Sequence, residues 1–413
     1  MRIAIVGAGI SGLVCAHYLN RNHEITVFES NGYAGGHTNT VPVREHDRSI
    51  SVDTGFIVYN EEYYPAFTSL LRYLGVATKP TTMSLSVRCD SSGLEYSGAS
   101  LNGLFAQRRN LISPGFWRMI AGILHFQREG PQLRAGLDDT ITVDRFIRDF
   151  GYPEEFVNYF LIPMGSALWS APAGSFRDFP MRFVIDFFAN HGMMQIRNRP
   201  DWRVIDGGSH RYVTALTRPF ASRIRLSDPV HALRRTAHGV EVRTAAGVEA
   251  FDEAIVACHA DRALALLDTP SAGEQTLLSA FPYERNDAVL HTDTSVLPRN
   301  RRAWGCWNYH LHNQSDRRAS VTYDMNRLQG LRSERRYCVS LNEAGIDESK
   351  IIRRITYHHP AFRPGRDRAQ GRHAELIRRE RVSYCGAYWG SGFHEAGVQS
   401  AQRVCAAFGE DTR

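Results

Sequence analysis

The sequence opens with a short apolar run that leads directly into a glycine-rich turn. Ile3 to Val6 has the pattern of a buried parallel strand, and Gly7-Ala8-Gly9-Ile10-Ser11-Gly12 follows at once. A helical pattern comes next, and a second apolar run from 24 to 28 ends at Glu29. A glycine motif alone predicts little, but this strand–turn–helix–strand order is typical of a Rossmann-like domain.

The three glycines of the turn have separate physical roles. Gly7 permits the tight turn, Gly9 lets the backbone approach a pyrophosphate, and Gly12 allows close helix–strand packing. The helix that follows presents free N–H groups and the positive end of its dipole to phosphates. Glu29 lies about 20 residues further on, where an acid accepts hydrogen bonds from a ribose. The opening segment therefore predicts a site for the adenosine diphosphate half of a dinucleotide.

A second glycine pair indicates which dinucleotide is bound. Gly35-Gly36-His37 follows Glu29 after five residues. With this pair, the sequence resembles the flavoprotein superfamily of amine oxidases, protoporphyrinogen oxidases and phytoene desaturases. The resemblance implies FAD as the cofactor. Many members have arginine after the glycine pair, whereas this chain has His37.

Later segments extend the resemblance. Thr54-Gly55-Phe56 is similar to the segment that passes beside the isoalloxazine ring, where glycine lets the backbone lie against the flavin. The stretch from Tyr384 to Ala401 is similar to the closing flavin motif, although Ala387 replaces the acid that most relatives carry there. The residues that the resemblance places at FAD are Gly7, Gly9, Ile10, Ser11, Gly12, Glu29, Ser30, Gly35, Gly36, His37, Thr54, Gly55, Phe56, Val230, Ala257, Gly386, Glu395, Gly397 and Val398. Ribityl contacts are expected from backbone groups or from Glu395.

The order of these segments predicts a two-domain α/β protein. A Rossmann-like, glutathione-reductase-like FAD-binding domain is expected to be discontinuous, from residues 1–75, 200–265 and 365–413. Residues 76–199 and 266–364 are expected to form a second, substrate domain with a mixed sheet and a helical block. A chain of 413 residues is long enough for both cores.

Composition excludes several other classes of protein. The net charge of +6 comes from scattered arginines, which favours a compositional bias over a nucleic-acid site. The seven cysteines are spread singly, without the spacing of a zinc cluster or a disulfide framework. His291 and Asp293 could form a metal pair, but an alternating strand explains them better, so no metal site is predicted. Unpaired thiols fit a reducing compartment, and we expect a cytoplasmic protein.

Two apolar helical stretches, 116–126 and 176–194, carry interspersed arginines such as Arg118 and Arg182. A wide apolar face edged by arginine suits a helix lying on an anionic membrane, or the wall of an acyl tunnel. A buried core helix explains the same pattern equally well. Peripheral contact with the inner membrane face is therefore one of two open interpretations.

Within the superfamily, the chain is similar to bacterial flavoproteins encoded beside cyclopropane-fatty-acid-synthase-like methyltransferases. The shared stretches include 36–40, 105–110 and 386–389. This resemblance implies a lipid acyl substrate and a methyltransferase partner.

The lysine content bears on the reaction. Many amine oxidases place a lysine near flavin N5, but Lys79 and Lys350 are the only lysines here and neither lies in a flavin motif. We therefore predict dehydrogenation (desaturation) of a fatty acyl chain by hydride transfer to N5, with Tyr388, Trp389 and His310 as catalytic candidates. One alternative is a flavin amine oxidase that acts on a small amine with oxygen as acceptor. Another is a flavin-bearing partner subunit of a methyltransferase, without turnover of its own.

Overall fold

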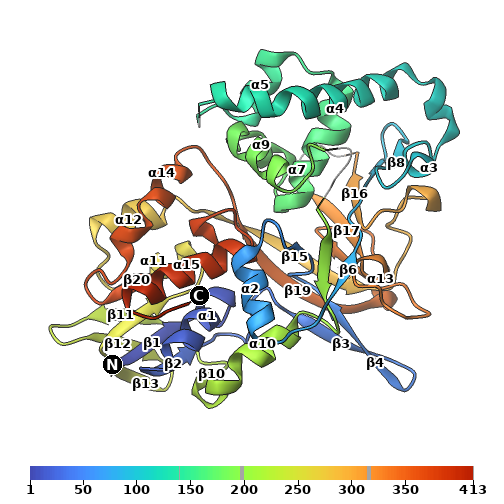
Figure 1. Cartoon of the computed structure of the whole chain (residues 1–413). Helices are drawn as coiled ribbons and strands as arrows, with labels where there is room; N and C mark the ends of the chain where they lie inside the picture. Colours follow the sequence, from blue (N-terminus) through green and yellow to red (C-terminus); the bar gives the residue numbers. More distant parts are fainter. Residues whose placement is uncertain (139, 196–199, 314–317, 413) are drawn as a thin grey trace.

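The computed structural model describes residues 1–138, 140–195, 200–313 and 318–412 (Figure 1). Both ends of the chain lie in the same part of the molecule, close to α1, α15, β1 and β2, whereas α4, α5, α7 and α9 form a block at the opposite end (Figure 1). Within the described residues, no helix is long and apolar enough to span a membrane.

The first part is built on a five-stranded parallel sheet. Its strand order is β10 (Ile224–Arg225), β2 (Glu24–Phe28), β1 (Arg2–Val6), β14 (Glu253–Val256) and β20 (Val382–Tyr384). Each neighbouring pair is parallel. The prediction of a Rossmann-like α/β fold is therefore confirmed.

Both faces of this sheet are covered, because β1 alternates between two cores. Ile3 and Ile5 pack with α1 (Ile10–Leu19), α10 (His210–Thr217) and α15 (His394–Ala407). Ala4 and Val6 belong to the core on the other side. That side is covered by β11 (Ala232–Arg235), β12 (Val240–Thr244), β13 (Gly247–Phe251), α11 (Ala260–Leu266) and α12 (Ala272–Leu278).

The second part contains a seven-stranded sheet. Its order is β19 (Ile351–Pro360), β15 (Tyr283–His291), β18 (Cys338–Leu341), β17 (Ser320–Asp324), β16 (Trp307–Leu311), β7 (Leu85–Cys89) and β8 (Glu95–Ser97). β16 and β7 are parallel and the other pairs are antiparallel. The predicted mixed sheet is thus present.

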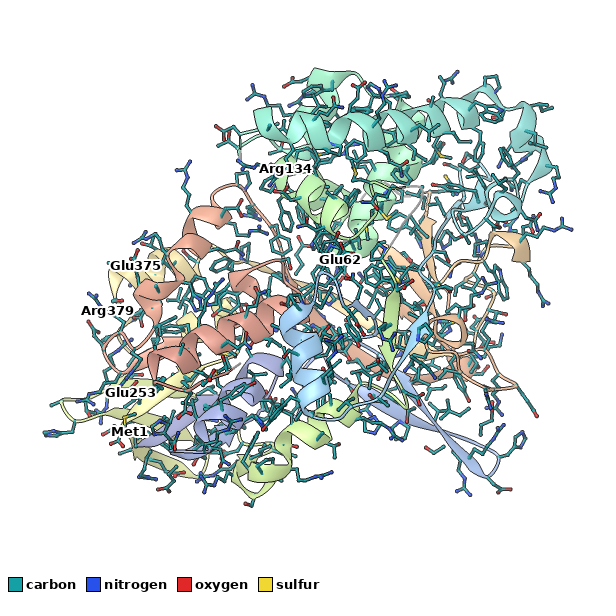
Figure 2. All side chains as sticks on the ribbon, viewed as in Figure 1. Met1, Glu62, Arg134, Glu253, Glu375 and Arg379 are labelled. Carbon is teal, nitrogen blue, oxygen red and sulfur yellow. The ribbon has the colours of Figure 1, made fainter. Side chains whose placement is uncertain are left out.

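A helical block covers this sheet at one end. It comprises α4 (Pro114–Leu133), α5 (Val143–Phe150), α7 (Ile162–Trp169), α8 (Ala173–Arg177) and α9 (Met181–Asn190). The helical stretch expected over 176–194 is divided, because Pro180 precedes α9 and ends the preceding helical turn. Arg134, labelled in Figure 2, pairs with Asp186 and joins the end of α4 to α9.

Shorter elements connect the two parts. β3 (Thr40–Glu45) and β4 (Arg48–Asp53) form a hairpin. β9 (Trp202–Ile205) pairs with β5 (Tyr59–Asn60) and β6 (Thr78–Thr81), and α2 (Pro65–Tyr73) lies beside α15 (Figure 1).

Candidate functional site

The predicted cofactor motifs meet at the carboxyl edge of the parallel sheet. Gly7 follows β1, Glu29 follows β2, Ala257 follows β14, and Gly386 lies just beyond β20. The N–H of Gly7 donates to the carbonyl of Phe28 at 2.8 Å, which closes the turn onto β2. Open α/β sheets bind their ligands at this edge. The arrangement therefore brings four distant segments to one cofactor site.

The glycine turn is shaped to leave room for a diphosphate. Gly7 has φ of +106°, and a Cβ on Gly12 would lie only 1.9 Å from the carbonyl oxygen of Gly7. A Cβ on Gly9, in contrast, would meet nothing within 4 Å. A side chain at position 9 would therefore project into open space, so the packing of the protein itself does not require glycine there.

The N-terminus of α1 is free to bind an anion. No side chain caps it, and its first turn contains no acidic residue. The first N–H groups of a helix have no partner within the helix and attract phosphate oxygens. Ile10, Ser11 and Gly12 supply these groups. Together with the open space at Gly9, they fit the diphosphate of FAD.

Glu29 is held at the edge of this turn by the backbone. Its Oε2 accepts a hydrogen bond from the N–H of Ala8 at 2.8 Å, and its Oε1 accepts one from the N–H of Asn31 at 2.8 Å. The hydroxyl of Ser30 also donates to Oε1, at 3.2 Å. The side-chain amide of Asn31 donates to Oε1 as well, at 2.8 Å, so Oε1 is fully engaged, whereas Oε2 keeps a second lone pair. Glu29 is therefore oriented, and its Oε2 can still accept a ribose hydroxyl.

The second glycine pair lies directly against the first turn. The N–H of Gly35 donates to the carbonyl of Ala8 at 2.7 Å. A Cβ on Gly36 would lie 3.2 Å from Cα of Gly9, and one on Gly35 would lie 2.4 Å from the carbonyl oxygen of Thr38. Both glycines also have positive φ, +128° and +61°. Close backbone contact thus accounts for both positions.

His37 contributes an unsatisfied polar atom beside this turn. Its ring stacks on Tyr357 with centroids 4.9 Å apart, and the rings of His359 and His259 lie 5.2 and 6.2 Å away. Burial lowers the pKa of His37 to about 3, so the ring is neutral at neutral pH. Its Nε2 is buried and has no hydrogen-bond partner among the residues that the structure describes. A buried polar atom without a partner fits a site completed by a polar cofactor.

The segment predicted beside the isoalloxazine ring joins the other motifs. A Cβ on Gly55 would lie 2.2 Å from the carbonyl oxygen of His37, and Thr54 donates its hydroxyl to the carbonyl of Asn39 at 2.8 Å. Phe56 stacks on His394 with centroids 3.5 Å apart. The structure therefore brings this segment, the second glycine pair and the closing motif together.

A buried carboxylate, Asp53, anchors this segment and was not identified from the sequence. It accepts hydrogen bonds from the N–H of Ser209 at 2.9 Å and from the amide of Gln329 at 2.8 Å. Burial raises the pKa of Asp53 to about 6, although the hydrogen bonds to Thr40 and Ser209 oppose this increase. The sequence feature that points to Asp53 is its position directly before Thr54, in the segment predicted to lie beside the isoalloxazine ring. Asp53 thereby fixes the end of β4 to the start of α10.

Residues of the closing motif contact two different helices, α1 and α2. Gly397 lies where α15 crosses α1, and its carbonyl accepts the hydroxyl of Ser11 at 3.0 Å; Val398 is buried in the same core. Glu395 is engaged elsewhere, because its carboxylate accepts the N–H groups of Ala66 and Phe67 at 3.0 and 2.9 Å. It caps α2, so the ribityl contact expected of Glu395 stays a prediction that its present bonds do not favour.

The remaining cofactor candidates lie at the same sheet edge. Ala257 donates its N–H to the carbonyl of Val6 at 2.8 Å, and Gly386 donates its N–H to the hydroxyl of Ser400 at 2.9 Å. Val230 lies between β10 and β11 and packs against the core of the flavin domain. These backbone positions fit the predicted cofactor contacts.

The three catalytic candidates are not brought together. Tyr388 and Trp389 are buried in the core on one face of the parallel sheet, where Tyr388 contacts Phe281 and Trp389 stacks on His373 with centroids 4.2 Å apart. His310 lies in β16 and donates a hydrogen bond from Nδ1 to Glu343 at 3.2 Å. These contacts favour structural roles for all three, in contrast to the predicted catalytic roles.

Phe393 links the closing motif to the helical block. It directly precedes α15 and stacks on Phe187 of the helical block with centroids 5.0 Å apart. Its ring therefore lies where these two parts of the molecule meet. Sequence reasoning missed Phe393, because it stands in a glycine-rich turn among several aromatic residues.

One hollow of the surface lies away from this site. A cavity of 650 Å³ is lined by residues that include Asn20, Glu24 and Ser222. Glu24 begins β2, so the cavity is at the edge of the sheet opposite the glycine turn. Cofactors of open α/β sheets do not bind at that edge.

Solved structures with the same fold include three enzymes. Cyclohexylamine oxidase from Brevibacterium oxydans IH-35A has 15% sequence identity and a TM-score of 0.70, covering 98% of each chain. Putrescine oxidase bound to putrescine has 15% identity and a TM-score of 0.68 over 99% of each chain. A fatty acid isomerase from P. acnes that produces CLA has 15% identity and a TM-score of 0.69 over 98% of each chain. At this identity the likeness shows the fold alone.

Sequence comparison identifies the family. No curated protein matches the chain in sequence. The profile of the family described as "Flavin containing amine oxidoreductase" matches residues 10–292, which is more than half of the chain. The predicted superfamily, the cofactor FAD and an enzymatic role as an oxidoreductase are therefore confirmed. The chain belongs to the flavin containing amine oxidoreductase family.

Proposed function

We propose that this FAD-dependent oxidoreductase dehydrogenates the acyl chain of a lipid. When bound, the flavin supplies the acceptor for a hydride from the substrate. The observation that carries the proposal is the aromatic wall formed by Trp169, Phe183, Phe187, Phe362 and Phe393, which extends from the helical block to the turn before α15. Such a wall binds a methylene chain by excluding water and offers an ammonium group no anionic partner.

The contacts along the aromatic wall are continuous. Trp169 lies 4.9 Å from Phe187 between ring centroids, and Phe362 lies 4.9 Å from Phe183. His191 extends the wall and stacks on Phe187 at 3.7 Å. Burial lowers the pKa of His191 to about 4, so it is neutral at neutral pH. The rings of the wall thus carry no charge themselves at neutral pH.

The buried cation at this wall also favours an acyl substrate over an amine. The guanidinium of Arg366 stacks over Phe183 and Phe362, at 4.0 and 4.4 Å from their centroids, and pairs with Asp367. Asp367 is therefore engaged by Arg366 and does not offer a free carboxylate to an ammonium substrate.

The two lysines support the same choice. Lys79 pairs with Asp206 at 3.1 Å, and Lys350 pairs with Asp293 at 3.2 Å. Both side chains are partly exposed and lie on β6 and at the start of β19. Neither supplies the lysine that many amine oxidases place near flavin N5. The fold alone does not distinguish an amine substrate from an acyl substrate, because solved structures with this fold include enzymes named for amines and one named for a fatty acid.

We further propose that the enzyme takes its lipid from an anionic membrane. Large apolar side chains are exposed along the segment before and within α4, among them Leu111, Ile112 and Trp117, and Ile112 is 85% exposed. Arg108 and Arg109 stand beside them and donate to the carbonyls of Phe105 and Gly93. Because these bonds are to neutral groups, both arginines keep a net positive charge. Apolar side chains with adjacent cations are typical of a membrane-surface site.

Anaerobic reduction of the bound flavin tests the substrate. The purified holoenzyme is mixed with a phospholipid extract or with a panel of amines that includes putrescine and cyclohexylamine, and the absorbance of oxidised flavin is followed. We expect bleaching by lipid and none by amines. Bleaching by amines alone would overturn the proposal, and turnover that requires an added methyltransferase would instead favour the partner-subunit interpretation.

Sedimentation with phosphatidylglycerol vesicles tests the membrane contact. Ile112→Glu and Trp117→Glu should abolish binding, and vesicles of phosphatidylcholine should bind the wild type weakly. Val248→Glu is the matched control, because Val248 is also exposed but lies on β13 of the flavin domain. Equal binding by all variants would exclude this surface.

A further inference from the structure

Four side chains outside the flavin motifs meet at one end of the seven-stranded sheet. His310 lies in β16 and His312 directly follows that strand. Asp90 follows β7, the parallel neighbour of β16, and Glu343 follows β18, two strands away on the other side. The sheet therefore gathers three segments that are far apart in the sequence.

A buried carboxylate lies against both imidazoles. Nδ1 of His310 is 3.2 Å from Oε1 of Glu343, and Nε2 of His312 is 3.3 Å from the same oxygen. The Glu343 side chain is 1% exposed, and the hydroxyl of Ser320 donates to its other oxygen. With its Nδ1–H donated to Glu343, a neutral His310 carries a lone pair on Nε2.

The opposite ends of the imidazoles converge on Asp90. Nε2 of His310 lies 3.0 Å from Oδ2 of Asp90, and Nδ1 of His312 lies 3.8 Å from the same oxygen. Nε2 of His310 is buried, and among the described residues no hydrogen bond of favourable geometry reaches it. Two ring nitrogens and a carboxylate oxygen thus face one another at separations of 3.0 and 3.8 Å from nitrogen to oxygen.

A single cation between these atoms satisfies all three. Ligand atoms held about 2.0–2.2 Å from a tetrahedral Zn²⁺ are about 3.3 Å apart, and the observed separations of 3.0 and 3.8 Å lie on either side of this distance. The two imidazole centroids are only 3.8 Å apart, so two protonated rings would repel each other. One shared divalent ion binds both rings without this repulsion.

We propose that Asp90, His310 and His312 bind a divalent transition-metal ion, with Zn²⁺ as the best match, and that Glu343 orients the two histidines. A carboxylate that holds the outer nitrogen of a ligating histidine is a frequent companion of zinc sites. Two imidazoles and one carboxylate leave a fourth position for water. The ion would join the ends of β7 and β16, and through Glu343 that of β18, in the substrate domain.

Zinc binding by the full-length, tag-free, FAD-loaded enzyme tests the proposal. After treatment with a chelator, the protein is dialysed against micromolar Zn²⁺ and its metal content is measured. We expect one Zn²⁺ per chain, and visible absorption typical of a four-coordinate site when Co²⁺ replaces zinc. Failure of the wild-type protein to bind stoichiometric zinc would overturn the proposal.

Three variants assign the ion to these residues. Asp90→Asn should lower zinc affinity at least tenfold; Asp90 lies at the surface, so this variant should keep its fold and its FAD. Glu343→Gln should lower the affinity about 10–100-fold through misoriented histidines. His125→Asn is the matched control, because His125 lies 3.5 Å from the carboxylate of Glu129 on the exposed side of α4. Unchanged zinc affinity in Asp90→Asn, or an equal loss in His125→Asn, would count against this site.

Discussion

The carboxylate of Glu395 accepts a hydrogen bond from the backbone N–H of Phe67 at 2.9 Å, so the first turn of α15 caps the N-terminus of α2. In Glu395→Gln, an NH₂ group would face one of the two backbone donors. We expect a loss of about 1–3 kcal/mol in the free energy of unfolding, measured by urea denaturation. Glu348→Gln breaks only an exposed ion pair with Arg354 and should cost less than about 1 kcal/mol. Equal losses in the two variants would refute the capping role.

Gly9 and Gly12 should respond differently to alanine. Because a Cβ at position 9 meets open space, Gly9→Ala should keep the thermal stability of the apoprotein and weaken FAD binding at least tenfold. Gly12→Ala should destabilise the apoprotein itself, since the new Cβ would lie 1.9 Å from a backbone oxygen. Thermal unfolding and a flavin fluorescence titration measure the two effects. Wild-type FAD affinity in Gly9→Ala would show that no diphosphate lies there.

Tyr388→Phe and Phe393→Ala separate packing from substrate contact. The buried hydroxyl of Tyr388 has no hydrogen-bond partner in the described part of the chain, so its removal should leave stability equal or slightly higher. The rate of flavin reduction by substrate should also stay the same. Phe393→Ala removes the ring that lies against Phe187 and should slow that reduction at least tenfold. A slow Tyr388→Phe enzyme would restore the catalytic role predicted from the sequence.

Three histidines near the glycine turn, His37, His259 and His359, predict that the folded protein loses stability in mild acid. Burial lowers the pKa of His37 and His359 to about 3 and that of His259 to about 4, below the ordinary value of 6.5. Protons therefore bind the unfolded chain more tightly, and stability is lost as the pH falls from about 6.5 toward 4. The apoprotein's melting temperature should drop through this window.

Substitution of His37 tests whether these three histidines cause the loss of stability in acid. His37→Asn should show a smaller decrease in melting temperature between pH 7 and pH 4 than the wild type, because one titrating group is gone. His125→Asn, at the surface of α4, should follow the wild-type curve. Parallel curves for all three proteins would mean that other groups cause the acid sensitivity.

The sequence predicts those parts of the candidate cofactor site whose residues lie close together along the chain. The glycine turn and Glu29 lie within one strand–helix–strand unit, and their spacing in that unit predicts a site for the adenosine diphosphate half of a dinucleotide. The position of Phe393 depends on how α15 meets the helical block, which no short segment encodes. The partners of His310 are equally hidden, because Asp90 and Glu343 come from other strands and His-Leu-His has the pattern of an ordinary strand. Glu395 stands beside the closing glycines in sequence, yet its carboxylate points to α2.

The register of the parallel sheet has a consequence for how the protein is made. The first strand is central, and Ile3 pairs with Glu253, while Ala254 pairs with Val382 near the end of the chain. During synthesis, β1 therefore keeps one unpaired edge until β14 has emerged from the ribosome. Closure over such long loops slows folding and leaves an unpaired strand edge exposed to aggregation. The parallel sheet that carries the candidate cofactor site is consequently completed only after β14 and β20 have been synthesised.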